Sequence, residues 1–92
     1  MKNFIETINS DFAALKKQVE KIISGESPKE KFIINENLYY MFGLIKSVQL
    51  EPQTEEDLNT NTKKLFAVKN LMNSLQNWYY LKIIYRAKKK IY

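Results

Sequence analysis

The 92-residue sequence predicts an all-α fold, an antiparallel three-helix bundle with a long C-terminal helix. Apolar residues recur in steps of three and four through most of the chain, as they do on one face of a helix, and no segment favours a strand. Turn-forming residues at positions 24–28 and at Glu51-Pro52 divide this pattern into three segments. We therefore expect one domain over residues 1–92, with helices at about 4–24, 28–49 and 55–90.

The first helix is predicted from a start signal and an unbroken apolar seam. Asn3 is the expected N-cap, and Glu6 completes an approximate capping box. The seam that follows keeps heptad spacing: Ile5, Ile8, Phe12, Leu15, Val19 and Ile22. Gly25 is expected to end the helix in a left-handed conformation.

The second helix has the clearest start signal in the chain, Ser27-Pro28-Lys29-Glu30. Its seam consists of Ile34, Leu38, Met41, Ile45 and Val48. Other apolar residues widen the face until it surrounds much of the helix, which is typical of a helix buried from two sides. Close approach of another helix would explain Gly43 in its interior, and Pro52 should prevent it from continuing.

The third helix opens at Thr54, a capping residue followed by three acids that suit the positive end of the helix dipole. Its seam runs Leu58, Asn61, Leu65, Val68, Met72, Leu75 and Tyr79. The polar stretch 59–62 has low helix propensity and leaves two alternatives. Either Asn61 fixes register inside a continuous helix, which we favour, or the chain breaks there and forms a four-helix bundle. From all three seams we expect these core residues: Ile8, Phe12, Leu15, Leu38, Met41, Ile45, Val68, Met72 and Leu75.

The lengths of the helices predict an uncovered end. The first two span about 30 Å each at 1.5 Å per residue, and a helix over 55–90 spans about 54 Å. We therefore expect the last 12 to 16 residues, from about Trp78 onward, to project past the bundle. Soluble monomers rarely expose large apolar patches, so another chain should cover this end, and a twofold homodimer is the simplest solution.

Charge is divided unevenly along the chain. Residues 1–57 contain all ten acidic residues and seven lysines, a net charge of −3, whereas residues 58–92 carry eight cations and no acid. Two interpretations remain open: the acidic part neutralises the basic part within the fold, or the basic surface faces an anionic partner.

The candidate site lies in the C-terminal helix, which is both aromatic and basic. The residues expected to bind a partner are Trp78, Tyr79, Tyr80, Leu81, Ile84 and Tyr85. The residues expected to contact an anion or a nucleic acid are Lys82, Arg86, Lys88, Lys89 and Lys90. The opposing interpretation is that the aromatic residues are ordinary core and the lysines are a solvated end that complements the helix dipole.

Missing residue types exclude several kinds of chemistry. Without His or Cys the chain cannot form a Cys/His zinc site, a disulfide or a Ser-His or Cys-His catalytic pair. Consecutive Glu55, Glu56 and Asp57 point in different directions, which suits the dipole better than acid–base catalysis. We therefore expect no enzymatic activity, no catalytic residue, no metal site and no cofactor.

The preferred functional hypothesis is a non-catalytic interaction or regulatory protein that associates with itself or with another protein through the C-terminal helix. A nucleic-acid-binding regulator is the first alternative, and a membrane-surface or bacteriocin-immunity-type protein is the second. In size, helical pattern and basic charge the chain resembles small bacterial or phage regulators and the helical immunity proteins of bacteriocin producers, a resemblance of class that no motif supports. No targeting or membrane-spanning segment is evident, so a cytoplasmic location is expected.

Overall fold

Three helices pack against one another in the computed structural model, which describes the backbone of residues 2–91 and the side chains of residues 3–89. They are α1 (Lys2–Ile23), α2 (Pro28–Lys46) and α3 (Glu55–Ile91), and the described residues form no strand. The predicted all-α three-helix bundle with a long C-terminal helix is therefore confirmed.

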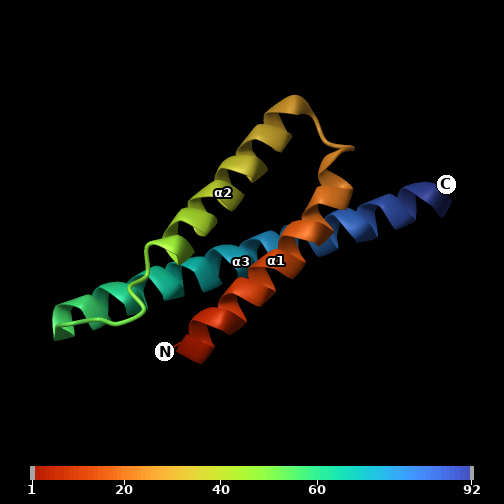
Figure 1. Ribbon diagram of the computed structural model, residues 1–92. Coiled ribbons are helices and arrows are strands. Elements are labelled where there is room, and N and C mark those ends of the chain that lie inside the picture. The colour runs from red at the N-terminus through yellow and green to blue at the C-terminus, as the bar shows by residue number, and fades with distance from the viewer. Residues whose placement is uncertain (1, 92) are drawn as a thin grey trace.

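The helices run up, down and up, so α2 is antiparallel to both of its neighbours (Figure 1). The Phe4 ring at the start of α1 lies 5.3 Å from Nζ of Lys69, and Arg86 contacts Ile22 at the end of α1. At the far end of α2, Nζ of Lys64 donates to the carbonyl of Ser47. The molecule is elongated, 58 × 23 × 16 Å, because α3 extends along its whole length.

The core forms where the three predicted seams meet. Each seam contributes residues with almost no exposed surface, including Val19, Met41 and Val68. Eight of the nine residues expected in the core belong to it, and the ninth, Met72, is half-buried and packs against it. Heptad spacing therefore predicted the buried face of every helix, except that Leu58, the first residue of the expected α3 seam, is 43% exposed.

Two of the three predicted helix starts are confirmed. The hydroxyl of Ser27 accepts a hydrogen bond from the backbone N–H of Glu30, 3.3 Å away. The hydroxyl of Thr54 accepts from the N–H of Asp57, whose carboxylate accepts in return from the N–H of Thr54. The prediction for α1 was wrong, because that helix begins at Lys2 and includes Asn3.

The polar stretch 59–62 is helical, so the four-helix alternative is excluded. Asn61 is 1% exposed and faces the connection between α2 and α3. Its side-chain oxygen accepts from the N–H of Gln49 at 3.1 Å, and its side-chain nitrogen donates to the carbonyl of Gln49 at 2.8 Å. Asn61 therefore fixes the position of the connection that precedes its own helix.

The uncovered end of α3 is shorter than the length argument predicted. Although α3 has 37 residues against 22 in α1, its surplus is divided between both ends. Phe4 lies beside Thr62 and Leu65, so the first turns of α3 extend beyond the start of α1. At the other end, the α1–α2 connection reaches Arg86. The projection therefore begins after Arg86 and not at Trp78.

Neither glycine has the predicted role. No described glycine has a positive φ, and α1 ends in a tight turn in which the N–H of Gly25 donates to the carbonyl of Ile22. A Cβ at Gly25 would lie 2.7 Å from a guanidinium nitrogen of Arg86, so this glycine allows close approach of α3. A Cβ at Gly43 would meet nothing within 4 Å, so no helix packs closely there.

Candidate interaction surface

An exposed apolar surface lies on the C-terminal part of α3. Leu81 and Tyr85 are 66% and 61% exposed, and Ile84 is also exposed beside them. Together with Trp78 they line a shallow hollow, which we call the aromatic surface. These residues are exposed although the bundle extends as far as Arg86, because α1 and α2 cover only part of the circumference of α3.

Besides Tyr85, this segment contains three aromatic residues, and their environments differ. Trp78 and Tyr79 are half-buried and pack against the core. Tyr80 is exposed on the side of α3 that faces α1, where it borders a hollow with Leu15. Of the six residues expected to bind a partner, the structure thus places Trp78, Leu81, Ile84 and Tyr85 together. Tyr79 and Tyr80 lie apart from that group.

The aromatic surface continues into a groove between α2 and α3. The groove is lined by Ile33 and Asn37 from α2 and by Leu71, Ser74 and Trp78 from α3, among others. Trp78 belongs to both hollows and connects them. The α3 residues of this combined face follow heptad spacing, which is the pattern of a helix that packs against a further helix. They are Leu71, Ser74, Trp78, Leu81, Tyr85 and Lys88.

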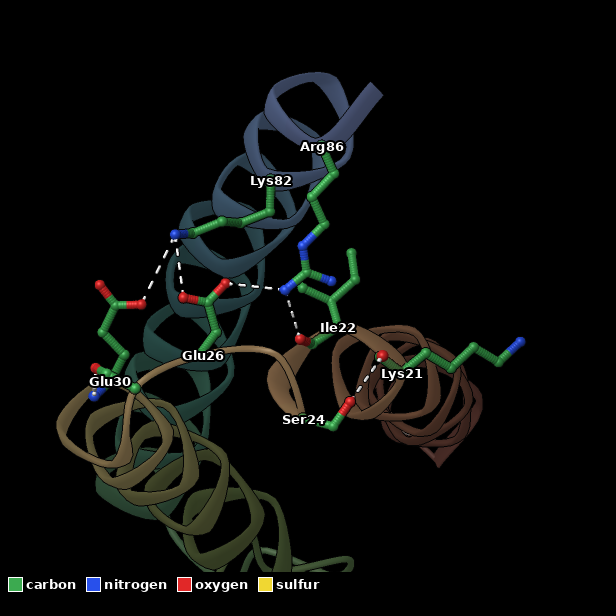
Figure 2. Close-up of polar contacts among 8 residues, drawn as sticks. Lys21, Ile22, Ser24, Glu26, Glu30, Lys82 and Arg86 are labelled. Carbon is green, nitrogen blue, oxygen red and sulfur yellow. Dashed lines mark hydrogen bonds and ion pairs between the residues drawn. The ribbon is translucent and has the colours of Figure 1, made fainter. Parts of the chain in front are cut away.

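A salt-bridge cluster joins the α1–α2 connection to α3 (Figure 2). One carboxylate oxygen of Glu26 lies 3.2 Å from Nζ of Lys82, and the other lies 3.3 Å from a guanidinium nitrogen of Arg86. The same guanidinium nitrogen donates to the carbonyl of Ile22 at 2.9 Å. Arg86 thereby gives the Ile22 carbonyl, which also accepts from the N–H of Gly25, a second and positively charged donor at the negative end of the α1 dipole.

The carboxylates of this cluster have shifted pKa values in opposite directions. Hydrogen bonding with Glu30, followed by the effects of Lys82 and Arg86, lowers the pKa of Glu26 despite its burial. The same contact with Glu26, together with the repulsion between the two carboxylates, raises the pKa of Glu30. The cluster therefore favours an ionised Glu26, which pairs with Lys82 and Arg86.

Four of the five predicted anion-contact residues have described side chains, and these fall into two groups. Lys82 and Arg86 are half-buried and already paired with Glu26, so part of the basic charge is neutralised within the fold. Lys88 and Lys89 are exposed, and Nζ of Lys89 lies 5.8 Å from the centre of the Tyr85 ring. The side chain of Lys90 lies outside the described residues.

The structure adds a second exposed face that the sequence interpretation missed. α2 is covered on one side alone, so the expectation that it is buried from two sides was wrong. Away from the core it exposes these large apolar residues, of which Ile33 also borders the groove toward α3: Phe32, Ile33, Tyr39, Tyr40 and Phe42. Their spacing was visible in the sequence, but periodicity cannot distinguish a face covered within the chain from one left for a partner. Glu26 was also missed, because a carboxylate in a connection belongs to no helical pattern.

The described part of the chain has neither a membrane-spanning helix nor a cluster of metal ligands. No helix there is both long enough and apolar enough to cross a membrane. The described acidic side chains also form no group of three that could hold a metal ion.

Comparison of the sequence and fold with protein-family models, curated proteins and solved structures gives no match.

Proposed function

We propose that this protein is a non-catalytic helical interaction module that associates with a second copy of itself through the aromatic surface of α3. The observation that carries this proposal is the exposure of Leu81, Ile84 and Tyr85 side by side on a regular helix. Exposed apolar patches of this kind are typical of protein–protein contacts, and aromatic residues dominate the energies of such contacts.

The composition of α3 supports the same conclusion. The segment from Asn70 to Leu81 contains no charged residue, although 27% of the residues in the chain are charged. Cores of protein interfaces are depleted of charge and enriched in Tyr and Trp, as this segment is. Exposed charges follow at the end of the segment, where Lys88 and Lys89 would form a polar rim.

The test is the mass of the protein in solution as a function of concentration, measured by sedimentation equilibrium. We expect wild-type mass to rise from the 10.9 kDa of one chain toward twice that value. Tyr85→Ala and Leu81→Ala should each raise the dissociation constant at least about tenfold, because each residue occurs twice in a symmetric contact.

Tyr39→Ala is the matched control, since it removes the same side chain from α2, where Tyr39 is 80% exposed. It should leave the dissociation constant nearly unchanged, and Lys88→Ala should have a smaller effect than Tyr85→Ala. Trp78→Ala is expected to weaken assembly as well, but its core contacts require a parallel measurement of folding. A wild-type protein that remains a monomer at millimolar concentration would refute self-association.

Nucleic-acid binding is the alternative that the exposed Lys63, Lys88 and Lys89 favour. It would give a complex that weakens steeply with salt, because phosphate contacts release counterions. The pairing of Lys82 and Arg86 with Glu26 leaves fewer cations for phosphates, so we rank this alternative second. A mobility shift with DNA or RNA at low salt that Lys88→Ala and Lys89→Ala abolish would reverse the ranking.

A further inference from the structure

We infer that a single-stranded nucleic acid binds on the first half of α3, where Phe66 and Phe4 of α1 are exposed beside each other. This site shares no residue with the aromatic surface, so it goes beyond the proposed self-association. Its basis is the pair of phenyl rings, the two lysines that flank Phe66 and the absence of acidic residues from this part of the α3 sequence.

Two phenylalanines from different helices border one hollow, which is also lined by Thr62 and Leu65. Phe66 is 61% exposed and Phe4 is 44% exposed, so the fold leaves a large part of both rings uncovered. Phe66 lies outside the heptad seam of α3, whereas its neighbour Leu65 is buried in that seam. The two rings therefore present aromatic surface to solvent, on which a nucleobase can stack.

Two lysines flank the Phe66 ring on the surface of α3. Lys63 lies three positions before Phe66 and Lys69 three positions after it, so about 9 Å of helix axis separates the two cations. Both lysines are exposed, and neither has a carboxylate within salt-bridge distance among the described side chains. Nζ of Lys69 lies 5.3 Å from the centre of the Phe4 ring, a contact that holds this charge beside the hollow.

The nearest carboxylates leave the charge of this site positive. The α3 sequence has no acid after Asp57, which lies six residues before Lys63 and caps the start of the helix. On α1, Glu6 lies about 160° around the helix from Phe4, at 3.6 residues per turn. Asp11 lies about 10 Å further along α1 and borders a separate hollow. An anionic partner is therefore favoured at the two rings.

The combination of rings and cations identifies the kind of anion. A second copy on this face would bring four unpaired lysines into one contact, and like charges repel one another. In a duplex the bases are stacked inside the helix, where an exposed phenyl ring cannot reach them. A single strand offers free base faces to Phe4 and Phe66 and phosphates to Lys63 and Lys69. Aromatic rings beside a basic surface are the features with which proteins bind single strands.

The test is the fluorescence anisotropy of a labelled oligothymidylate titrated with the full chain at low salt. We expect wild type to bind, with an affinity that falls as salt rises, because phosphate contacts release counterions. Phe66→Ala should weaken binding about tenfold, and Phe66→Leu should do the same, since leucine is apolar but has no ring on which a base can stack. Lys63→Ala and Lys69→Ala should each weaken binding and reduce the salt dependence by about one phosphate contact.

The chain offers a matched control for each kind of variant. Phe32→Ala is the control for Phe66→Ala, because Phe32 is 65% exposed on α2. Lys46→Ala is the control for Lys69→Ala, because Nζ of Lys46 lies 5.2 Å from the centre of a phenyl ring of its own helix. Both controls should leave the affinity nearly unchanged, and circular dichroism would verify that every variant is folded.

Several results would overturn this inference. Wild type that binds no oligothymidylate at low salt would do so, as would equal losses for Phe66→Ala and Phe32→Ala. Equal affinity for a duplex of the same length would show that phosphates alone are recognised. Binding that depends on Lys88 and Lys89 but not on Phe66 would place the contact about 30 Å away, at the end of α3. Flotation with phosphatidylserine vesicles that depends on Phe66, without binding to the oligonucleotide, would assign this face to a membrane.

Discussion

Asn61 is the clearest case in which one polar side chain determines a local structure. It lies in the apolar seam of α3 and is 1% exposed, yet both ends of its amide group are bonded to the backbone of Gln49. An unpaired amide at this depth would destabilise the fold, so the two hydrogen bonds fix where the α2–α3 connection lies.

Asn61→Ala is expected to lower the free energy of unfolding by about 2–3 kcal/mol, because it leaves the N–H and carbonyl of Gln49 without their partners. Urea unfolding would measure the loss. The control is Asn59→Ala, an exposed position two residues away, which should change stability by less than about 0.5 kcal/mol. Equal effects at the two positions would contradict a role for the amide of Asn61.

At the scale of elements, the salt-bridge cluster joins three parts of the chain. Glu26 in the connection binds two cations of α3, and Arg86 reaches the last turn of α1. Gly25 makes the approach possible, since a side chain there would meet the guanidinium group. The cluster therefore determines which turn of α3 the α1–α2 connection contacts.

Glu26→Gln should lower the free energy of unfolding at pH 7 by about 1–2 kcal/mol, because the Glu26 side chain is 8% exposed and its cations are partly solvated. The folded-state pKa of Glu26 lies below its ordinary value of 4.5, so the stabilising charge is present above that pH. It is lost as pH falls through the lowered pKa, and wild type and variant should then converge. Unfolding measured from pH 7 to pH 2 would show this.

Glu30→Gln is the matched control for that experiment. The pKa of Glu30 is raised, so the fold favours its protonated form, which glutamine resembles. This variant should not lower stability at pH 7. A loss as large as that of Glu26→Gln would mean that the two carboxylates share the cations equally.

Gly43 offers a test of helix propensity within α2. A methyl group there would meet open space, so Gly43→Ala should raise the free energy of unfolding by about 0.5–1 kcal/mol. Thermal or urea unfolding of a dilute sample would measure the gain. A decrease would show that another helix lies against this face of α2.

At the scale of the whole molecule, proposed self-association makes stability depend on protein concentration. Association favours the folded state by mass action, so the midpoint of thermal unfolding should rise by roughly a few °C for each tenfold increase in concentration. Tyr85→Ala should flatten this dependence and Tyr39→Ala should retain it. A wild-type midpoint that is independent of concentration would oppose the proposal.

The fold could be predicted from the sequence because three heptad seams and two capping motifs report local geometry. The position of the helices along one another could not, since Glu26 and Arg86 are 60 residues apart and no pattern links them. The sequence also could not predict which aromatic side chains are exposed. Tyr39 and Tyr79 are both aromatic residues in apolar helices, yet Tyr39 faces outward and Tyr79 packs against the core.

Trp78 gives the proposed assembly an optical consequence. It is the sole indole in the sequence, and it lies half-buried between the groove and the aromatic surface. When a second chain covers it, the ring exchanges its remaining water for protein, and its fluorescence emission should move to shorter wavelength. The molecule thus carries an intrinsic reporter at the point where its two copies would meet.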